Sequence, residues 1–334
     1  MPDAPLLAVV VPAYKRDFLE QALASLAAQT DQRFHLYVFD DASPADLEEI
    51  YRRVFPGEHP ARRFVRFGEN LGGRSLVQQW NRCVERTGGE PWVWLFSDDD
   101  VADHHCVANF YAALQADAAG GQHPLVYRFN TVTIDAAGAV LSLSPPHPEW
   151  EDELHFIYHR MRYQRNSYAP DYLFAREAFD RCGGFVEFPF ALGSDDASWI
   201  AFSGGRPMRT INGAYVYFRL SGSNTSVVRS DQAVEKVLAF FEVAQWMHGR
   251  VGKRTIPLGQ APGGVDIHDA IRQWSRWTIH SLPQRLPLRA VERLAARLHG
   301  REGLTKNGVR LRLLRSNGQV LMRQAARWAK SWLE

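Results

Sequence analysis

The first half of the chain alternates short apolar runs with amphipathic stretches. The run LLAVVVP at residues 6–12 is apolar and rich in β-branched side chains, which predicts a buried strand, and residues 34–39, 64–67 and 92–96 share this character. The intervening stretches carry apolar residues at helical spacing, which predicts helices over residues 17–30, 43–54 and 75–86. This repeated strand–helix order is typical of an open parallel sheet with right-handed crossovers.

Local signals indicate where the first two helices begin. Asp17 and Glu20 have the spacing of a capping box, so the first helix is expected to begin near Asp17. Ser43 followed by Pro44 is typical of a helix with proline in its first turn, so the second helix is expected to begin there.

The rest of the chain is less regular and then becomes helical. Residues 125–134 and 139–143 flank a turn, which predicts a hairpin. We expect a helix at residues 149–165 that covers the ligand site, and a strand at 172–175. Two short helices are expected at 176–182 and 197–202, and one or two strands at 208–220. From Ser230 the apolar pattern is helical, and the Gly/Pro-rich segment 257–264 predicts a linker within it.

Three adjacent carboxylates, Asp98, Asp99 and Asp100, directly follow the apolar run at 92–96. Because like charges repel, a folded protein keeps them together only if a positive group sits there or solvent screens them. At the carboxyl end of a central strand, the expected positive partner is a divalent cation that carries a ligand. The alternative is a solvated acidic turn that caps a helix beginning near Asp103.

Length and composition narrow the class of protein. A chain of 334 residues favours two domains, and 46% hydrophobic with 23% charged residues is ordinary for a soluble globular protein. Three scattered cysteines predict reduced thiols in a cytosolic protein. The sequence contains neither a signal peptide nor an apolar run long enough to cross a bilayer.

The net charge of +2 conceals two halves of opposite sign. Residues 1–228 hold 20 Lys and Arg against 29 Asp and Glu, whereas residues 229–334 hold 19 against 8. We therefore expect a catalytic domain at 1–228 and a basic, mostly α-helical region at 229–334. The basic helices either pack on the catalytic domain or make a peripheral contact with an anionic membrane. Nucleic-acid binding is not expected beside so acidic a first half.

Six short motifs together resemble glycosyltransferase family 2 over roughly residues 6–225. They are VVVPAYKR at 9–16, FDDAS at 39–43, ENLGG at 69–73 with Arg74, FSDDD at 96–100, CGGF at 182–185 and SDDASW at 194–199. The resemblance implies an α/β protein with the GT-A fold, a Rossmann-like open mixed sheet flanked by helices, here with a C-terminal helical extension. It also implies an inverting transferase that uses a nucleotide-sugar donor.

The same resemblance implies that the nucleotide-sugar donor binds near the end of the first strand and at the turn after the third strand. Pro12 shapes the turn, Tyr14 packs near the base, Arg16 belongs to the same motif, and Arg74 matches an arginine near the phosphates. Tyr14 has simple packing as its alternative role, and Arg74 has that of a surface arginine at a helix start.

Carboxylates are assigned to the donor by the resemblance. Asp40 or Asp41 would accept the imide N–H of the base, and since a carboxylate only accepts, a uracil- or thymine-like edge is favoured. Asp98 would touch the ribose. Asp99 would ligate Mn²⁺ or Mg²⁺, with Asp100 as a second or water-mediated ligand, and the cation would stabilise the departing diphosphate.

On the acceptor side, Asp195 and Asp196 match an acidic pair whose second member is the general base. Asp196 is therefore the expected base and Asp195 its alternate, while both could instead cap the following helix. Many members of the family carry a metal-binding histidine after the last core strand, but residues 217–221 contain none. Arg219 or Asn224 is expected to contact the diphosphate instead.

The sequence thus predicts a cytoplasmic, metal-dependent inverting glycosyltransferase, peripheral to the inner membrane face if its basic helices bind lipid. It would move sugar from a UDP- or dTDP-linked donor to a hydroxyl of a surface glycan, most simply a lipid-linked one. Two rivals remain: a nucleotide-sugar-binding scaffold that has lost catalysis, and a sugar-1-phosphate nucleotidyltransferase. The second would need a glycine-rich loop after the first strand, and PAYKRD has no glycine.

Overall fold

The computed structural model describes residues 6–220, 232–256, 266–280, 286–315 and 317. The chain divides into two compact units. Unit 1 comprises Met1–Glu187 and Ser194–Asn224, and unit 2 comprises Phe188–Gly193 and Thr225–Glu334.

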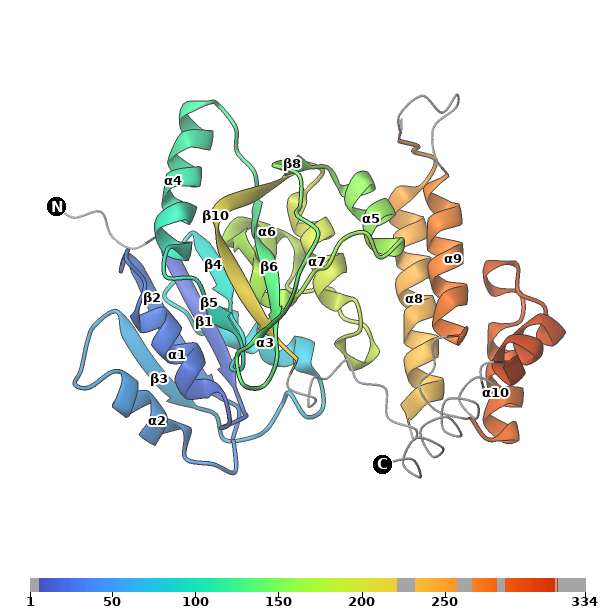
Figure 1. The fold of residues 1–334 in the computed structure, drawn as a ribbon, viewed down its shortest axis with the longest axis horizontal. Coiled ribbons are helices and arrows are strands. Elements are labelled where there is room, and N and C mark those ends of the chain that lie inside the picture. Colours follow the sequence, from blue (N-terminus) through green and yellow to red (C-terminus); the bar gives the residue numbers. More distant parts are fainter. Residues whose placement is uncertain (1–5, 221–231, 257–265, 281–285, 316, 318–334) are drawn as a thin grey trace, which may run out of the picture. The chain divides into compact units, whose positions relative to one another are not determined.

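Unit 1 is built on one mixed sheet with the strand order β3-β2-β1-β4-β9-β6-β10-β5 (Figure 1). Its parallel part is made of β1 (Leu7–Ala13), β2 (Phe34–Asp40), β3 (Arg62–Arg66) and β4 (Trp92–Leu95). The antiparallel strand β9 (Tyr172–Ala175) lies between β4 and β6 (Val126–Ile134). Beyond β6 come β10 (Met208–Arg219) and β5 (Val101–Ala102), while β7 (Val140–Leu143) pairs with β6 and β8 (Trp150–Glu151) pairs with β10.

Helices cover both faces of this sheet, as the continuous apolar strands require. One face packs its alternate residues, such as Leu7, Val9 and Val11, against α1 (Leu19–Ala27), α2 (Leu47–Val54) and α4 (Cys106–Ala119). The remaining helices are α3 (Leu76–Glu85), α5 (Glu153–Met161), α6 (Arg176–Cys182) and α7 (Ser194–Ser203), with the 3₁₀ turn η1 (Ala169–Asp171). The predicted α/β class, with an open mixed sheet flanked by helices, is confirmed.

The predicted starts of the first two helices are wrong, and for the second helix the reason is a tertiary contact. α1 begins at Leu19 and its N-cap, Phe18, makes no side-chain cap hydrogen bond. α2 begins three residues after Pro44, and its cap is Asp46, whose side chain accepts from Glu49 N at 3.0 Å. Ser43 is used elsewhere, since its Oγ donates to the Tyr14 carbonyl at 2.7 Å. The hairpin of β6 and β7 is confirmed, and residues 208–219 form one strand with a bulge.

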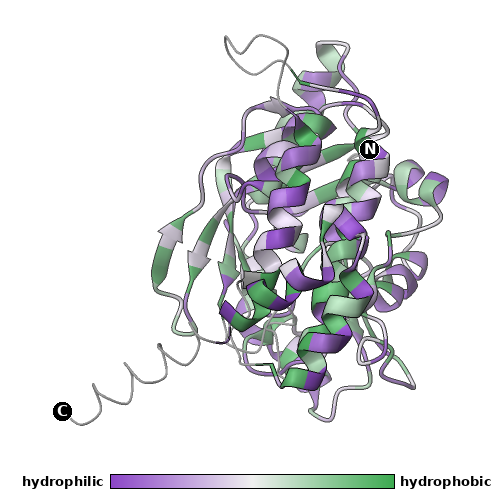
Figure 2. Ribbon diagram, turned by 90° about the vertical axis from the view of Figure 1, so that its right-hand side faces the viewer, coloured by the Kyte–Doolittle hydropathy of each residue, from purple (hydrophilic) through white to green (hydrophobic). Residues whose placement is uncertain are grey.

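Among its described residues, unit 2 contains the 3₁₀ turn η2 (Pro189–Ala191) and the helices α8 (Ala233–Val251), α9 (Ile267–His280) and α10 (Leu288–Leu298). The turn η4 (Arg301–Gly303) and a helical stretch at residues 306–315 follow. Its core gathers apolar residues at helical spacing, including Val234, Leu238, Phe241 and Leu294. Figure 2 shows hydrophobic and hydrophilic residues alternating along the helical ribbons. None of the described helices is long and apolar enough to span a membrane. The predicted linker at 257–264 lies outside the described residues.

Candidate active site

The acidic triplet after β4 is buried and ties two loops together. Asp98 Oδ2 accepts from the backbone N–H groups of Tyr14 and Lys15, both at 2.8 Å. Asp100 Oδ1 accepts from Arg219 N at 2.7 Å, and the Asp100 side chain is fully buried. The triplet therefore joins the loop after β1 to the end of β10. A solvated acidic turn does not fit this burial.

Burial makes Asp98 and Asp100 hold their protons more tightly than free carboxylates do. Burial first, and then the charge of Asp99, raise the pKa of Asp98 to about 6. The same two causes raise the pKa of Asp100 well above its ordinary value. Asp99 Oδ2 has a cation beside it, the Lys15 ammonium at 3.1 Å. Sequence reasoning missed Lys15, although it adjoins Tyr14 in the chain.

These residues fit a divalent cation that takes part of its coordination from a substrate. Carboxylate oxygens are the hard ligands that Mg²⁺ and Mn²⁺ prefer. Asp100 Oδ2 is buried without a hydrogen-bond partner, as an oxygen intended for a cation would be. No three His, Cys, Asp or Glu side chains among the described residues form a group that could hold a metal ion. Mg²⁺ sites commonly use one or two carboxylates and complete their shell with phosphate oxygens and water, so this absence does not conflict with the fit.

Asp40 lies at the end of β2, as predicted, but is enclosed by internal partners. Its side chain is fully buried, its Oδ1 accepts from Ser43 N at 2.7 Å, and its Oδ2 binds the Arg66 guanidinium. These contacts fix the turn after β2. They satisfy both carboxylate oxygens within the protein.

Asp41 is likewise occupied and shapes the turn at residues 70–73. Its Oδ1 accepts from Leu71 N at 2.9 Å and from Arg82 Nη2 at 2.7 Å, and its Oδ2 accepts from Gly72 N at 2.8 Å. A Cβ at Gly72 would lie 2.7 Å from Asp41 Oδ2, so this position requires glycine. The predicted glycine turn is therefore held by the predicted aspartate.

The other residues predicted to bind the donor differ in their exposure and in the partners they already have within the protein. Pro12 lies within β1, opposite Phe39. The Tyr14 side chain is 43% exposed, which fits a ring that packs on a ligand. Arg16 Nη2 lies 3.3 Å from Glu49. Arg74 pairs with Glu69 at 2.6 Å, and both side chains are 65% exposed, which fits the surface role kept as its alternative.

Arg219 does not fit the predicted contact with a diphosphate. It is fully buried, its Nε donates to the Asp99 carbonyl at 2.8 Å, and its Nη2 donates to Gln21 Oε1 at 2.7 Å. Its Nη1 donates to the carbonyls of Asp135 and Ala136. The guanidinium therefore joins helix α1 to the loop after β4 and to the turn between β6 and β7. Asn224, the other candidate, lies outside the described residues.

The acidic pair lies in the first turn of α7, and a cation from α5 contacts it. Arg160 Nε lies 2.9 Å from Asp196 Oδ2, and the Asp196 side chain is buried. Burial first, and then the charge of Asp196, raise the pKa of Asp195 to about 7. One member of the pair is thus ion-paired and the other titrates near neutrality. No local sequence signal marks Arg160.

Asp171 interacts electrostatically with both the acidic triplet and the Asp195–Asp196 pair. It is fully buried in η1, and its Oδ2 accepts from Thr131 Oγ1 at 2.9 Å and from Tyr168 N at 3.0 Å. Burial is the main cause that raises its pKa to about 8, with Asp195 contributing, and its own charge raises the pKa of Asp100. Carboxylates far apart in the sequence therefore form one electrostatically coupled series.

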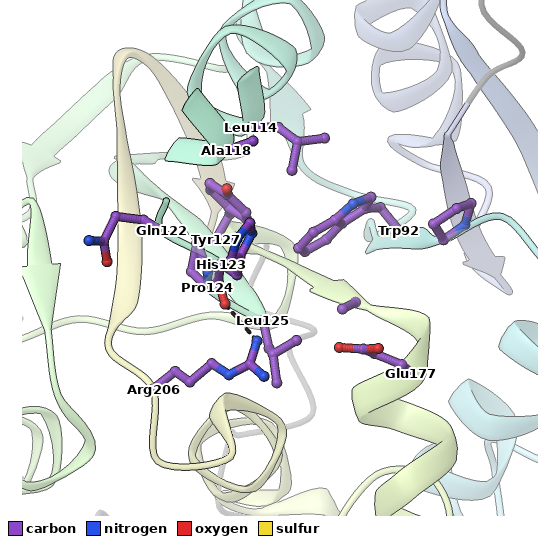
Figure 3. Close-up of a pocket in the computed structure, with 12 residues that line it drawn as sticks. Trp92, Leu114, Ala118, Gln122, His123, Pro124, Leu125, Tyr127, Glu177 and Arg206 are labelled. Carbon is purple, nitrogen blue, oxygen red and sulfur yellow. Dashed lines mark hydrogen bonds between the residues drawn. The ribbon is translucent and has the colours of Figure 1, made fainter. Parts of the chain in front are cut away.

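A pocket of about 300 Å³ lies elsewhere in unit 1, as Figure 3 shows. Trp92, the first residue of β4, and Ala175, the last of the antiparallel β9, line it, so it lies at the amino end of β4. Arg206 Nη1 donates to the His123 carbonyl at its rim at 2.8 Å (Figure 3). The triplet follows the opposite end of β4, so this pocket is separate from the candidate active site.

Comparisons with known proteins agree with this architecture. S. aureus TarS 1–349 in complex with UDP-GlcNAc superposes with a TM-score of 0.63 at 14% identity, covering 96% of this chain and 92% of that one. Mannosyltransferase PcManGT from Pyrobaculum calidifontis, in complex with GDP-Man and Mn²⁺, gives a TM-score of 0.52 at 16% identity, with 96% and 88% coverage. At these identities the likeness shows the fold.

The sequence comparisons give the family. A search of curated proteins finds no match. The model of the family described as "Glycosyl transferase family 2" matches residues 8–181, just over half of the chain. The chain therefore belongs to glycosyl transferase family 2 and is a glycosyltransferase.

Proposed function

We propose that this glycosyltransferase moves a sugar from a UDP- or dTDP-linked donor to a hydroxyl of a surface glycan, with inversion and with the help of Mn²⁺ or Mg²⁺. The observation that carries the proposal is a series of buried carboxylates, with Asp99 and Asp100 after β4 at one end, Asp196 in the first turn of α7 at the other, and a basic side chain beside each end. A metal-assisted leaving group at one end and a general base at the other would use such a series.

Asp99 and Asp100 would hold the cation at the donor end of the series. When bound, the cation supplies positive charge that stabilises the departing diphosphate. Asp98 keeps the loop after β1 against the triplet, because it accepts both backbone N–H groups of Tyr14 and Lys15. The exposed Tyr14 ring supports packing on the base. TarS in complex with UDP and with UDP-GlcNAc supports a uridine nucleotide, and PcManGT in complex with Mn²⁺ supports the cation.

The chemistry at the acceptor end is a single displacement. A carboxylate of the Asp195–Asp196 pair takes the proton of the acceptor hydroxyl as its oxygen forms a bond to the anomeric carbon. The bond from that carbon to the diphosphate oxygen breaks with its electron pair, and the nucleoside diphosphate leaves from the opposite face. We assign the base to Asp196, which Arg160 orients, and keep Asp195 as its alternate.

We infer further that the acceptor is lipid-linked and that the basic region at 229–334 brings the enzyme to the inner face of an anionic membrane. The excess of basic residues there and the amphipathic helix α10 support this inference. Flotation with anionic and neutral vesicles tests it. Equal recovery with both kinds of vesicle contradicts it.

A thermal-shift panel of UDP, dTDP and GDP, each with and without Mn²⁺, tests the donor. The expected result is stabilisation by UDP or dTDP that grows when Mn²⁺ is present, because ligands that bind only the folded state raise its stability. Release of UDP from a UDP-sugar then separates an enzyme from a scaffold that has lost catalysis. Nucleotide binding with no release of UDP from any donor would favour the scaffold.

A further inference from the structure

An ammonium group lies where the proposed cation would be held. Lys15 Nζ is 3.1 Å from Asp99 Oδ2, and the side chains of the two residues are 33% and 8% exposed, respectively. Asp99 is a proposed ligand of the cation, and Asp100 Oδ2 beside it is buried without a partner. Lys15 and a divalent cation would therefore bind the same carboxylate, that of Asp99.

The backbone of Lys15 is fixed independently of its side chain. Its N–H donates to Asp98 Oδ2 at 2.8 Å, as does the N–H of Tyr14. The ammonium is a compact charge at the end of a flexible four-carbon stem. It can leave Asp99 by changing rotamer while the loop after β1 stays in place.

Arg219 is another cation close to the triplet among the described residues, but it cannot take this part. Arg219 is fully buried, and its guanidinium donates to the carbonyl of Asp99 rather than to its carboxylate. Its contact with Asp100 is made by the backbone N–H. In the part of the chain that the structure describes, Lys15 is thus the residue that pairs with the Asp99 carboxylate.

We propose that Lys15 competes with the divalent cation for Asp99, and that on cation binding its ammonium moves to the diphosphate of the donor. This rests on the proposed function, in which the cation and the donor bind together. In the free enzyme the Lys15 ammonium pairs with the Asp99 carboxylate. In the complex with cation and donor it pairs instead with phosphate oxygens of the donor. The cation binds weakly alone, and nucleotide and cation strengthen each other's binding, a coupling that must be reciprocal.

The test measures Mn²⁺ affinity rather than catalysis. Free Mn²⁺ is followed by electron paramagnetic resonance during titration of the full chain, with and without saturating UDP. Lys15→Gln should bind Mn²⁺ alone about tenfold more tightly than the wild type, equivalent to about 1.4 kcal/mol. The strengthening of Mn²⁺ binding by UDP should shrink by a similar factor. Lys15→Arg keeps the charge and should stay closer to the wild type.

A matched control removes the same charge elsewhere. Arg53 pairs with Glu20 and Glu49 on the surface, and Arg53→Gln should leave Mn²⁺ affinity unchanged. If Lys15→Gln binds Mn²⁺ no more tightly than the wild type, the competition does not exist. If the wild type binds no Mn²⁺ even with UDP, the metal dependence under the proposed function fails first, so the two failures are distinguishable.

Discussion

Removing Arg160 should shift the pH dependence of transfer. Its Nε lies 2.9 Å from Asp196 Oδ2, and its charge also lowers the pKa of Asp195 against the larger effects of burial and of Asp196. Asp195, the alternate base, can take the proton of the acceptor hydroxyl only after losing its own. If Asp195 is the base, activity should rise with pH through about pH 7 in the wild type, following its pKa of about 7. Arg160→Gln removes the cation that favours this deprotonation.

The size of the shift follows from charge and exposure. Two unit charges about 4 Å apart interact by about 4 kcal/mol at an effective dielectric constant of about 20. The Arg160 side chain is 25% exposed, and water entering the vacated space screens the pair further. A net loss of about 1.4 kcal/mol raises the apparent pKa by about one unit. At pH 7 the deprotonated fraction then falls from about one half to about one tenth, so kcat/KM should fall roughly fivefold from this cause.

The assay is kcat/KM for a UDP-sugar measured from about pH 5 to about pH 9. Arg160→Gln should recover much of its activity at the alkaline end, whereas a merely misfolded variant would be inactive throughout. Arg160→Lys keeps the charge and should keep the wild-type midpoint more closely. The reasoning is refuted if Arg160→Gln loses activity equally at every pH, or if its midpoint stays near 7.

The remaining predictions concern single residues and the donor. Asp99→Asn and Asp196→Asn should each lower transfer by about 10³-fold or more with unchanged far-UV circular dichroism, and full activity in either would remove its assigned role. Arg219→Met should lower the free energy of unfolding by about 3 kcal/mol or more in chemical denaturation, because several buried oxygen atoms would lose their hydrogen-bond donor. Arg74→Ala removes an exposed ion pair and should change the same quantity by less than about 1 kcal/mol. UDP with Mn²⁺ should raise the melting temperature more than UDP alone, and equal shifts would argue against metal coupling.

Apolar runs and strand ends were readable from the sequence because they are local. The β-branched runs became β1, β2 and β4, and the residues that follow them reached the same edge of the sheet. The position of β9 was not readable, because it pairs with β4 and β6 across long stretches of chain. The predicted start of the second helix failed for the same reason. Ser43 looked like the beginning of a helix, but its hydroxyl bonds to the chain after β1.

The arginines that pair with the predicted aspartates could not be predicted from the sequence either. Arg66, Arg82 and Arg160 come from β3, α3 and α5, and no spacing rule connects them to the carboxylates they contact. Arg219 shows the converse case. Its place after the last long strand suggested a ligand contact, yet the end of β10 is buried and turns its guanidinium toward carbonyls.

These contacts divide the predicted acids into two kinds. Asp40 and Asp41 accept backbone N–H groups in addition to an arginine, so their oxygens are held by the turns they stabilise. Among the described contacts, Asp99 and Asp196 each have one partly exposed side-chain cation and accept no backbone N–H. Asp196 Oδ1 is in addition buried without a partner.

That difference decides where ligands can exchange with the protein. Displacing Asp40 or Asp41 would leave backbone donors unpaired, which costs more than releasing one partly exposed side chain. A bound cation or an acceptor hydroxyl can instead replace Lys15 at Asp99 or share Asp196 with Arg160 without disturbing a turn. The chemistry is therefore expected at Asp99 and Asp196. The two aspartates after β2 then act through the shape of the donor site, so replacing them should lower stability as well as activity.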